Sequence, residues 1–184
     1  DGTVLALDEA YIDTAPSGTA PTIDVSNPKV LRFRTFSKAY GMAGARIGSC
    51  LGEAAVIRHF EKVRNHYGII RIAQIGALAA LHDQDYLKET VGRIEAARKR
   101  IAGIAQDHGL VALPSATNFV TVDCGRDGDY ARSRLQGLLE RDIFVRMPGV
   151  AVFDRCIRIG AGLPEDLTLF EEMLPAALKA ADGV

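Results

Sequence analysis

The pattern of hydrophobic and polar positions changes along the chain, and the first third reads as short strands joined by loops. Residues 3–7 are apolar almost throughout, a pattern typical of a strand that is buried on both faces of a mostly parallel sheet. Residues 13–29 are rich in proline, glycine and small polar residues and predict a loop. Two more short apolar runs predict strands at residues 30–33 and 47–51.

Helical spacing dominates the middle of the chain. Residues 53–64 carry apolar side chains on one face, and residues 72–82 are apolar nearly all round, which predicts a buried helix. The longest helix is predicted over residues 85–107, where apolar positions recur at steps of three and four and charged side chains occupy the opposite face. Gly109 then provides a C-terminal stop.

After Gly109 short strands alternate with helices. Strands are predicted at residues 110–113, 119–122, 143–146 and 156–159, and helices at residues 129–141 and 164–181. The fold class is therefore α/β: part of a large domain with a mostly parallel sheet, followed by a small α+β domain. We expect the first domain to span residues 1–84, the connecting helix 85–108 and the small domain 109–184.

Composition narrows the classes of function. The chain has 184 residues, 48% of them hydrophobic and 24% charged, with a net charge of −1. This balance argues against nucleic acid as a partner, and no apolar run is long enough to predict a membrane span. The cysteines Cys50, Cys124 and Cys156 show no metal-ligand or redox spacing. We interpret them as buried thiols in a reducing, cytoplasmic compartment, and predict no metal site.

One lysine stands out because of its neighbours. Lys38 follows the hydroxyl residues Thr35 and Ser37, precedes two glycines, and has Arg46 eight residues further on. Hydroxyls, flexible backbone and a planar guanidinium can together bind a phosphate. A lysine beside an anion site is what an enzyme needs to form an imine with an aldehyde cofactor such as pyridoxal 5′-phosphate (PLP).

A carboxylate and an aromatic hydroxyl precede this lysine. Asp8 ends the first predicted strand, where ligands bind in open α/β sheets, and Tyr11 follows three residues later. A carboxylate is the group that keeps the ring nitrogen of PLP protonated.

These segments resemble the cofactor site of the fold type I PLP-dependent aminotransferases (class I/II), most closely the histidinol-phosphate aminotransferase group. The resemblance extends from about Leu5 to the last helix. It implies that Lys38 forms the imine and is the catalytic residue. It also implies the other cofactor contacts: Asp8 to the ring nitrogen, Tyr11 to the ring hydroxyl, and Thr35, Ser37 and Arg46 to the phosphate.

The same resemblance assigns the substrate site. Residues 156–160 are similar to the segment whose arginine, here Arg158, binds the substrate α-carboxylate, and Arg146 matches a position that can meet the distal end of the substrate. Strand alternation alone favours neither this role nor a solvent-facing position for Arg158. A charge on an edge strand is an equal alternative for Arg146.

The cofactor residues also have plainer interpretations. A lysine on a loop is usually a solvated charge, and Asp8 could cap a following turn. Tyr11 could be an ordinary core or surface aromatic, and Arg46 could form a surface ion pair of little energetic value. The joint order and spacing of these residues favour the cofactor site.

The resemblance implies an aminotransferase that moves an amino group between an amino acid or amino-alcohol phosphate (histidinol-phosphate-like or aromatic) and a 2-oxo acid. It also implies a homodimer. The alternatives are a threonine-phosphate decarboxylase-like PLP enzyme, or an inactive C-terminal fragment. Because family chains are about twice this long, we expect this one to be the C-terminal half of a longer protein.

Overall fold

The structure of the protein is a computed structural model, and it describes residues 2–181. The chain divides into two compact units, Asp1–Val91 and Gly92–Val184. The boundary lies within the longest helix, α3 (Gln84–Asp107), which the sequence predicts to within one residue. The proposed division at residues 84 and 108 stays a prediction, and its outermost residues, 1 and 182–184, lie outside the described part.

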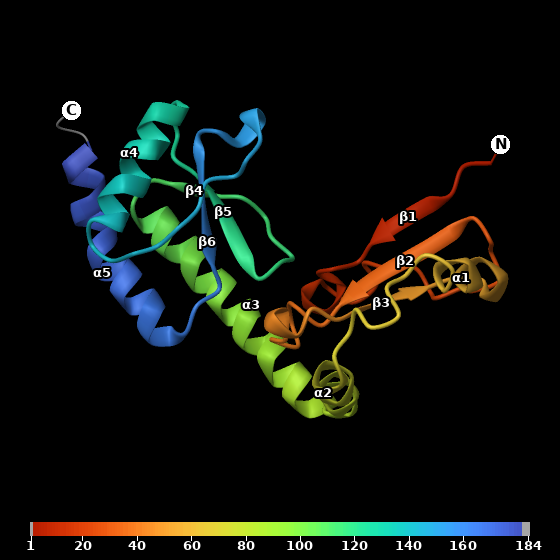
Figure 1. Ribbon diagram of the computed structural model, residues 1–184. Helices are drawn as coiled ribbons and strands as arrows, with labels where there is room; N and C mark the ends of the chain where they lie inside the picture. Colours follow the sequence, from red (N-terminus) through yellow and green to blue (C-terminus); the bar gives the residue numbers. More distant parts are fainter. Residues whose placement is uncertain (1, 182–184) are drawn as a thin grey trace. The chain divides into compact units, whose positions relative to one another are not determined.

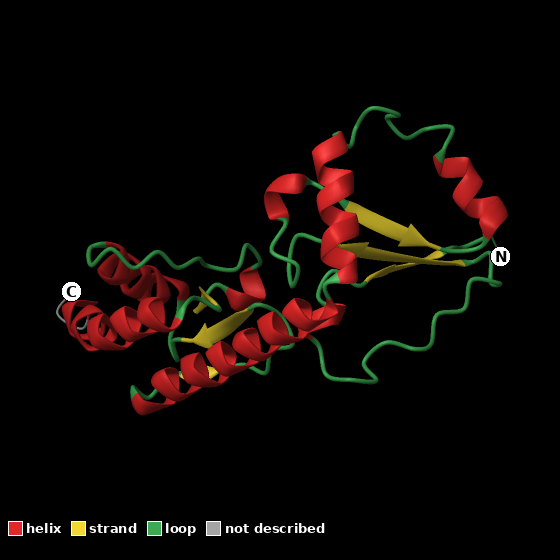
Figure 2. Ribbon diagram, turned by 90° about the horizontal axis from the view of Figure 1, so that it is seen from below, coloured by secondary structure: helices red, strands yellow, loops and turns green. Residues whose placement is uncertain are grey.

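The first unit is built on a three-stranded sheet with the order β1-β2-β3. Its strands are β1 (Leu5–Asp8), β2 (Val30–Thr35) and β3 (Gly48–Leu51). They form the adjacent arrows near the N-terminus in Figure 2. β1 pairs with β2 in parallel and β2 pairs with β3 in antiparallel orientation, so the described part of this sheet is mixed.

Two helices follow the sheet in the first unit. α1 (Ala54–Phe60) is shorter than predicted, and its N-terminus is capped by Glu53, whose carboxylate accepts hydrogen bonds from the amides of Ala55 and Val56. α2 (Arg71–His82) begins one residue before its predicted start. Two short 3₁₀ helices complete this unit, at Ile12–Thr14 and Ala43–Ala45.

Two predictions of burial in this unit are wrong. β1 was expected to be buried on both faces, but it lies at the edge of the described sheet and Leu5 is 52% exposed. α2 was expected to be buried, but its large apolar side chains face outward and Ile72 is 79% exposed. Only the small residues Ala73 and Ala77 are buried, because the helix packs within the described residues through its alanine face alone.

The second unit combines an antiparallel sheet with packed helices (Figure 1). Its strands are β4 (Val111–Ala112), β5 (Phe119–Asp123) and β6 (Cys156–Gly160). Its helices are the C-terminal part of α3, α4 (Gly128–Leu139), a 3₁₀ turn at Ala151–Phe153, and α5 (Pro164–Ala181). The core contains Ile101 of α3, Leu138 of α4, Ile157 of β6 and Leu174 of α5, each 0% exposed. This arrangement matches the predicted small α+β domain.

The strand predicted at residues 143–146 does not form. Only one bridge connects this segment to β6, through hydrogen bonds of 3.1 and 2.6 Å between the backbones of Arg146 and Arg158. Asp142, just before it, has a φ of 60°, and Pro148, just after it, has no amide hydrogen to donate. These two residues limit how far the pairing can extend.

The described residues contain no helix long and apolar enough to cross a membrane. Cys124 and Cys156 are buried as expected, while Cys50 is only half-buried. Burial raises the pKa of the Cys124 thiol to about 11, with smaller contributions from Cys156 and Asp123. This thiol is therefore protonated at neutral pH.

Candidate functional site

The candidate cofactor site lies where β1 and β2 end. Asp8 is the last residue of β1 and is paired with Phe33, two residues before Thr35 ends β2. Because the two strands are parallel, their carboxyl ends share one edge of the sheet, the edge at which open α/β sheets bind ligands.

Strand alternation sorts the side chains at this edge onto two faces. Asp8 and Thr35 lie on the face of Phe33, because side chains of one face recur at every second residue and paired residues share a face. Arg32 and Arg34 lie on the opposite face of β2. The predicted cofactor residues of these strands therefore come to a common face.

Asp8 and Thr35 are fixed by local hydrogen bonds. The Asp8 carboxylate accepts a hydrogen bond from the amide of Ala10 at 3.0 Å, and the side chain is exposed. The Thr35 hydroxyl accepts one from the amide of Ser37, also at 3.0 Å. Both hydrogen bonds stabilise local turns. Asp8 therefore caps the turn that follows β1, as its plainer interpretation predicts, and it uses one carboxylate oxygen to do so.

Lys38 lies in a tight turn directly after β2. The amide of Gly41 donates to the carbonyl of Lys38 at 2.9 Å, and Gly41 has a φ of 68°, which favours glycine. The turn directs the Lys38 ammonium over the Tyr11 ring, 5.0 Å from its centre. Among residues 2–181 no carboxylate lies within ion-pair distance of this ammonium. The structure thus brings together Lys38 and Tyr11, which the sequence places 27 positions apart.

Arg46, the predicted phosphate arginine, follows Lys38 in a separate turn. It ends a 3₁₀ turn with a φ of 51°, and its guanidinium donates to the carbonyl of Ala43 at 2.9 Å. The side chain is exposed and forms no ion pair within the described residues. Its role toward a phosphate stays a prediction.

The residues at this edge fit the chemistry of PLP. A half-buried amine without a counter-ion, an exposed carboxylate and two hydroxyls at a turn are the groups that the aldehyde, ring nitrogen and phosphate require. A Cβ added at Gly41 or Gly44 would meet no atom within 4 Å, so the backbone beside Lys38 is open to a ligand.

The sequence interpretation missed three charged residues directly behind this site. Glu9 is 8% exposed and Arg32 3%, and two nitrogens of Arg32 donate to Glu9 Oε1, one of them, Nε, at 2.8 Å. Arg34 Nε donates to Glu9 Oε2 at 3.0 Å. Two arginines on one face of a strand, next to an acid that ends the neighbouring strand, were the available signal.

The electrostatics of Glu9 follow from these contacts. Burial alone would raise the pKa of the Glu9 carboxyl, but the hydrogen bonds and charges of Arg32 and Arg34 outweigh it and hold the pKa below its ordinary value. Glu9 is therefore ionised at neutral pH and its negative charge is satisfied within the protein.

The predicted substrate arginines belong to the second unit. Arg158 lies on β6, paired with Thr121 of β5, and its guanidinium stands 4.6 Å from the centre of the Phe119 ring. It lines a hollow of about 360 Å³ with Phe153, Pro148 and the hydroxyl residue Thr117. Arg146 is exposed and lies over Phe144, with 5.8 Å between guanidinium and ring centre. The backbone bridge joins the two arginines, but only Arg158 lines the hollow.

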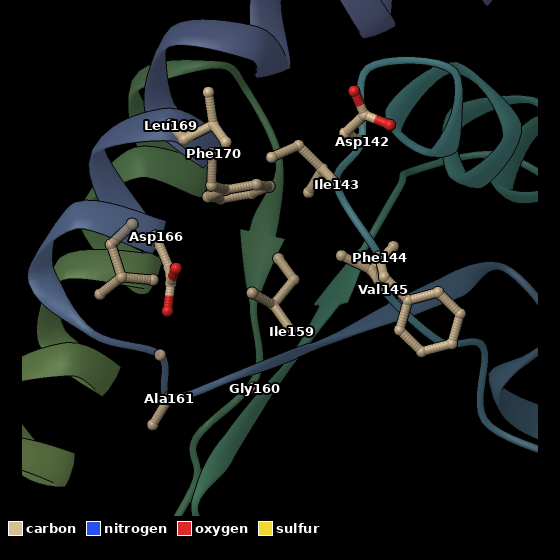
Figure 3. Close-up of a pocket in the computed structure, with 12 residues that line it drawn as sticks. Asp142, Ile143, Phe144, Val145, Ile159, Gly160, Ala161, Asp166, Leu169 and Phe170 are labelled. Atoms are coloured by element: carbon tan, nitrogen blue, oxygen red, sulfur yellow. The ribbon is translucent and has the colours of Figure 1, made fainter.

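A second hollow of the same unit is different in character (Figure 3). It has a volume of about 310 Å³ and is lined mainly by apolar side chains such as Ile143, Ile159 and Phe170. Two carboxylates, of Asp142 and Asp166, stand at its margin, and Asp166 already accepts a hydrogen bond from the amide of Leu163. No predicted site residue lines this hollow, so it gives no support for a cofactor or substrate role.

Comparisons with known proteins show which proteins this chain is similar to. The chain is 37% identical over 178 residues to a histidinol-phosphate aminotransferase of Bacillus velezensis, covering 93% of this chain and 49% of that protein. It is 36% identical over 181 residues to histidinol-phosphate aminotransferase 2 of Pseudomonas fluorescens, covering 97% and 48%. The chain therefore spans about half the length of these curated relatives.

Solved structures show the same fold. A crystal structure of histidinol-phosphate aminotransferase from Sinorhizobium meliloti in complex with pyridoxal-5′-phosphate superposes with a TM-score of 0.93 at 50% identity, covering 97% of this chain and 49% of that one. An L-threonine-O-3-phosphate decarboxylase from Porphyromonas gingivalis superposes with a TM-score of 0.74 at 18% identity, which is a likeness of fold alone.

The predicted fold class is confirmed by these structures. The sequence profile of one family, described as aminotransferase class I and II, matches residues 1–169. The chain belongs to the class I and II aminotransferase family.

Proposed function

We propose that the protein carrying this chain is a PLP-dependent aminotransferase, with Lys38 as the residue that holds the cofactor. The observation that carries the proposal is the position of the Lys38 ammonium, over Tyr11 and at the sheet edge where Asp8 ends β1. Its amine has no counter-ion among the described residues, so it is available to bond covalently to an aldehyde. The names of the relatives support the same cofactor and reaction class.

Each residue has a defined task in this proposal. When bound, PLP supplies an electron sink that allows a proton to leave the Cα atom of an amino compound. Lys38, once released, moves that proton as general base and acid. Asp8 holds a proton on the ring nitrogen, Tyr11 donates to the ring hydroxyl, and Thr35, Ser37 and Arg46 bind the phosphate.

The substrate class is the finer part of the proposal. We infer an amino-alcohol phosphate of the histidinol phosphate type, or an aromatic amino acid, as amino donor, and a 2-oxo acid as acceptor. The support is the name shared by the relatives at 36–37% identity. Arg158 would bind the anionic group of either substrate, and Arg146 would meet its distal end. The decarboxylase shares only the fold at 18% identity, so amino transfer is favoured.

One experiment tests the cofactor and the reaction together. The purified protein is incubated with PLP, reduced with borohydride, digested and analysed by mass spectrometry, which should locate the adduct on the peptide that contains Lys38. In parallel, histidinol phosphate and 2-oxoglutarate should yield glutamate. Release of CO₂ from threonine phosphate without glutamate would favour the decarboxylase. No adduct on any lysine, either of residues 1–184 or of a longer form of the protein, would refute the PLP proposal. An adduct on a longer form of the protein but not on residues 1–184 would identify this chain as an inactive fragment.

We also propose that the protein acts as a homodimer in the cytoplasm. The support for self-association is the exposed apolar face around α2, since exposed apolar patches of this kind usually contact another protein surface. Its largest members are Tyr67, Ile70, Ile72, Ile75 and Leu78, all at least 58% exposed. Light scattering after size exclusion should give twice the chain mass, and a monomer would refute the dimer. The unpaired cysteines support the compartment.

A further inference from the structure

We infer that Glu9, Arg32 and Arg34 form a charge cluster that positions Asp8 and Tyr11 against Lys38 without touching cofactor or substrate. The inference rests on the proposed function, because it assigns a task toward the PLP site. The resemblance to the family assigns no role to Glu9, Arg32 or Arg34.

The cluster lies on the opposite face from the candidate site. Arg32 and Arg34 alternate with Phe33 and Thr35 along β2, and Glu9 alternates with Asp8 at the end of β1. The cluster residues are therefore directed behind the sheet edge, while Asp8 and Thr35 are directed in front of it. Groups on the rear face are therefore inferred to act on the site through the backbone that they hold.

Glu9 is the connection between the two strand ends. Its amide donates to the carbonyl of Phe33 at 2.8 Å, which continues the pairing of β1 with β2 by one residue. Its carboxylate accepts three hydrogen bonds from Arg32 and Arg34, so both oxygens are bonded to β2. Backbone and side chain of one residue thus fix where β1 ends relative to β2.

The neighbours of Glu9 are the residues that this connection controls. Asp8 precedes it, and Tyr11 follows in the turn that the carbonyl of Glu9 closes by accepting from the amide of Ile12 at 3.0 Å. Arg34 is followed directly by Thr35, the last residue of β2, and Lys38 comes three residues after Thr35. A shift of β1 against β2 would therefore change the separation between Tyr11 and Lys38.

The cluster also holds the long loop that joins the two strands. Arg32 Nη1 donates to the carbonyl of Pro21 at 3.0 Å, and this loop contains no helix after the 3₁₀ turn at Ile12–Thr14. Since Arg32 is almost completely buried, its position is set by Glu9 and Pro21 rather than by solvent. The contacts of Arg32 with Glu9 and Pro21, and of Arg34 with Glu9, therefore tie β1, β2 and the loop between them together at the edge of the described three-stranded sheet.

A pair of variants separates positioning from stability. Buried ion pairs can often be replaced by apolar residues of similar volume without loss of stability. The double variant Glu9→Met/Arg32→Met should therefore keep its melting temperature while losing the directional bonds. Arg34→Gln removes one bond from a side chain that is 32% exposed, so this variant should also fold. Glu171→Gln is the matched control, because it removes the surface pair with Arg100, at 2.9 Å, in the second unit.

The readouts are the dissociation constant of PLP, from absorbance titration, and the induced circular dichroism of bound PLP, which reports its orientation. We expect both cluster variants to bind PLP about 10- to 100-fold more weakly, by analogy with the loss of metal affinity when the residues that orient metal ligands are mutated. The circular dichroism band should also lose amplitude at an unchanged melting temperature. Glu171→Gln should match the wild type in both readouts.

The outcomes distinguish this inference from the proposed function. If neither this chain nor a longer form of the protein gives a borohydride adduct at Lys38, the proposed function fails first. If the wild type binds PLP and the folded double variant binds it with the same affinity and dichroism, the cluster has a stabilising role only and the inference is wrong. Should the double variant not fold, Arg34→Gln decides by the same criteria.

Discussion

The Lys38 ammonium lies 5.0 Å from the centre of the Tyr11 ring, a distance at which the negative face of an aromatic ring attracts a cation. The two residues belong to turns that follow different strands, β1 and β2. The contact therefore depends on how the ends of β1 and β2 are aligned. The contributions of the aromatic ring and of the hydroxyl of Tyr11 can be separated by substitution.

We predict that Tyr11→Phe and Tyr11→Ala differ in effect. Phenylalanine keeps the ring under the ammonium and removes only the hydroxyl, so PLP affinity should fall by about fivefold, the value of one hydrogen bond of about 1 kcal/mol. Alanine removes the ring as well, which should weaken binding by a further factor of about two to five. Absorbance titration with PLP measures both constants. Equal affinities for the two variants would show that the ring contact has no value.

The second prediction concerns Arg158 and the ring beneath it. Because the guanidinium stacks on Phe119 at 4.6 Å, lysine cannot replace it: an ammonium lacks both the planar face and the paired donors. Arg158→Lys should raise the KM for the amino donor by about tenfold or more, as expected for the loss of one charge-assisted hydrogen bond of about 1.5–3 kcal/mol. The PLP dissociation constant should not change.

A comparison for this prediction comes from Arg146, which we propose to meet the distal end of the substrate. Arg146 is exposed and does not line the hollow of Arg158, so Arg146→Lys should change KM much less. Steady-state kinetics of the two variants give the comparison. A larger effect at Arg146 than at Arg158 would exchange their proposed roles.

Most elements of the fold could be predicted because local signals were unambiguous. The stripe of apolar residues over 85–107 and the Pro164-Glu165-Asp166 start of the last helix place α3 and α5 almost to the residue. The strand at residues 143–146 failed because alternation says nothing about the backbone that follows, and Pro148 stops the pairing.

Burial and the rear of the site could not be predicted from local patterns. An apolar run such as that of α2 shows which side chains prefer burial, but not whether another part of the protein covers them. Asp8, Tyr11 and Lys38 were proposed from residue type, spacing and family resemblance, and the structure shows the contact between Lys38 and Tyr11. The partners of Glu9 were missed because they depend on the register of β1 with β2, which places Arg32 and Arg34 behind Glu9.

The third prediction is a pH dependence of stability that arises at Asp13. Burial raises the pKa of the Asp13 carboxyl above its ordinary value of 3.8, and although Arg34 lowers it, the net shift is upward. The folded state therefore holds this proton more tightly than the unfolded state. The corresponding stability is fully present below pH 3.8 and is lost as the pH rises through the raised pKa of the folded state.

Asp13→Asn mimics the protonated side chain at every pH. We expect this variant to be more stable than the wild type at pH 7, where the wild type carries a half-buried charge. The difference should vanish near pH 3.5, where the wild-type carboxyl is protonated in the folded state. Urea unfolding midpoints at pH 7, 5 and 3.5 give the comparison. A variant less stable than the wild type at pH 7 would show that the charge of Asp13 is needed beside Arg34.

The last prediction compares two helical glycines with opposite surroundings. Gly103, in α3, has no atom within 4 Å of the position that a Cβ would occupy, whereas a Cβ on Gly137, in α4, would lie 3.0 Å from the carbonyl oxygen of Ala177 in α5. Alanine is favoured over glycine in a helix by about 1 kcal/mol, so Gly103→Ala should stabilise the protein by up to that amount. At Gly137 the same gain is opposed by overpacking, which costs about 1–3 kcal/mol.

The obstacle at Gly137 is backbone, so it cannot be relieved by a side-chain rotation; α4 and α5 would have to move apart. Gly137→Ala should therefore lower the free energy of unfolding by about 1 kcal/mol net, opposite in sign to Gly103→Ala. Thermal or urea unfolding of both variants measures the two signs in one series. If both substitutions stabilise the protein, α4 and α5 are less tightly packed than the structure shows, and the core around Leu138 and Leu174 must tolerate their separation.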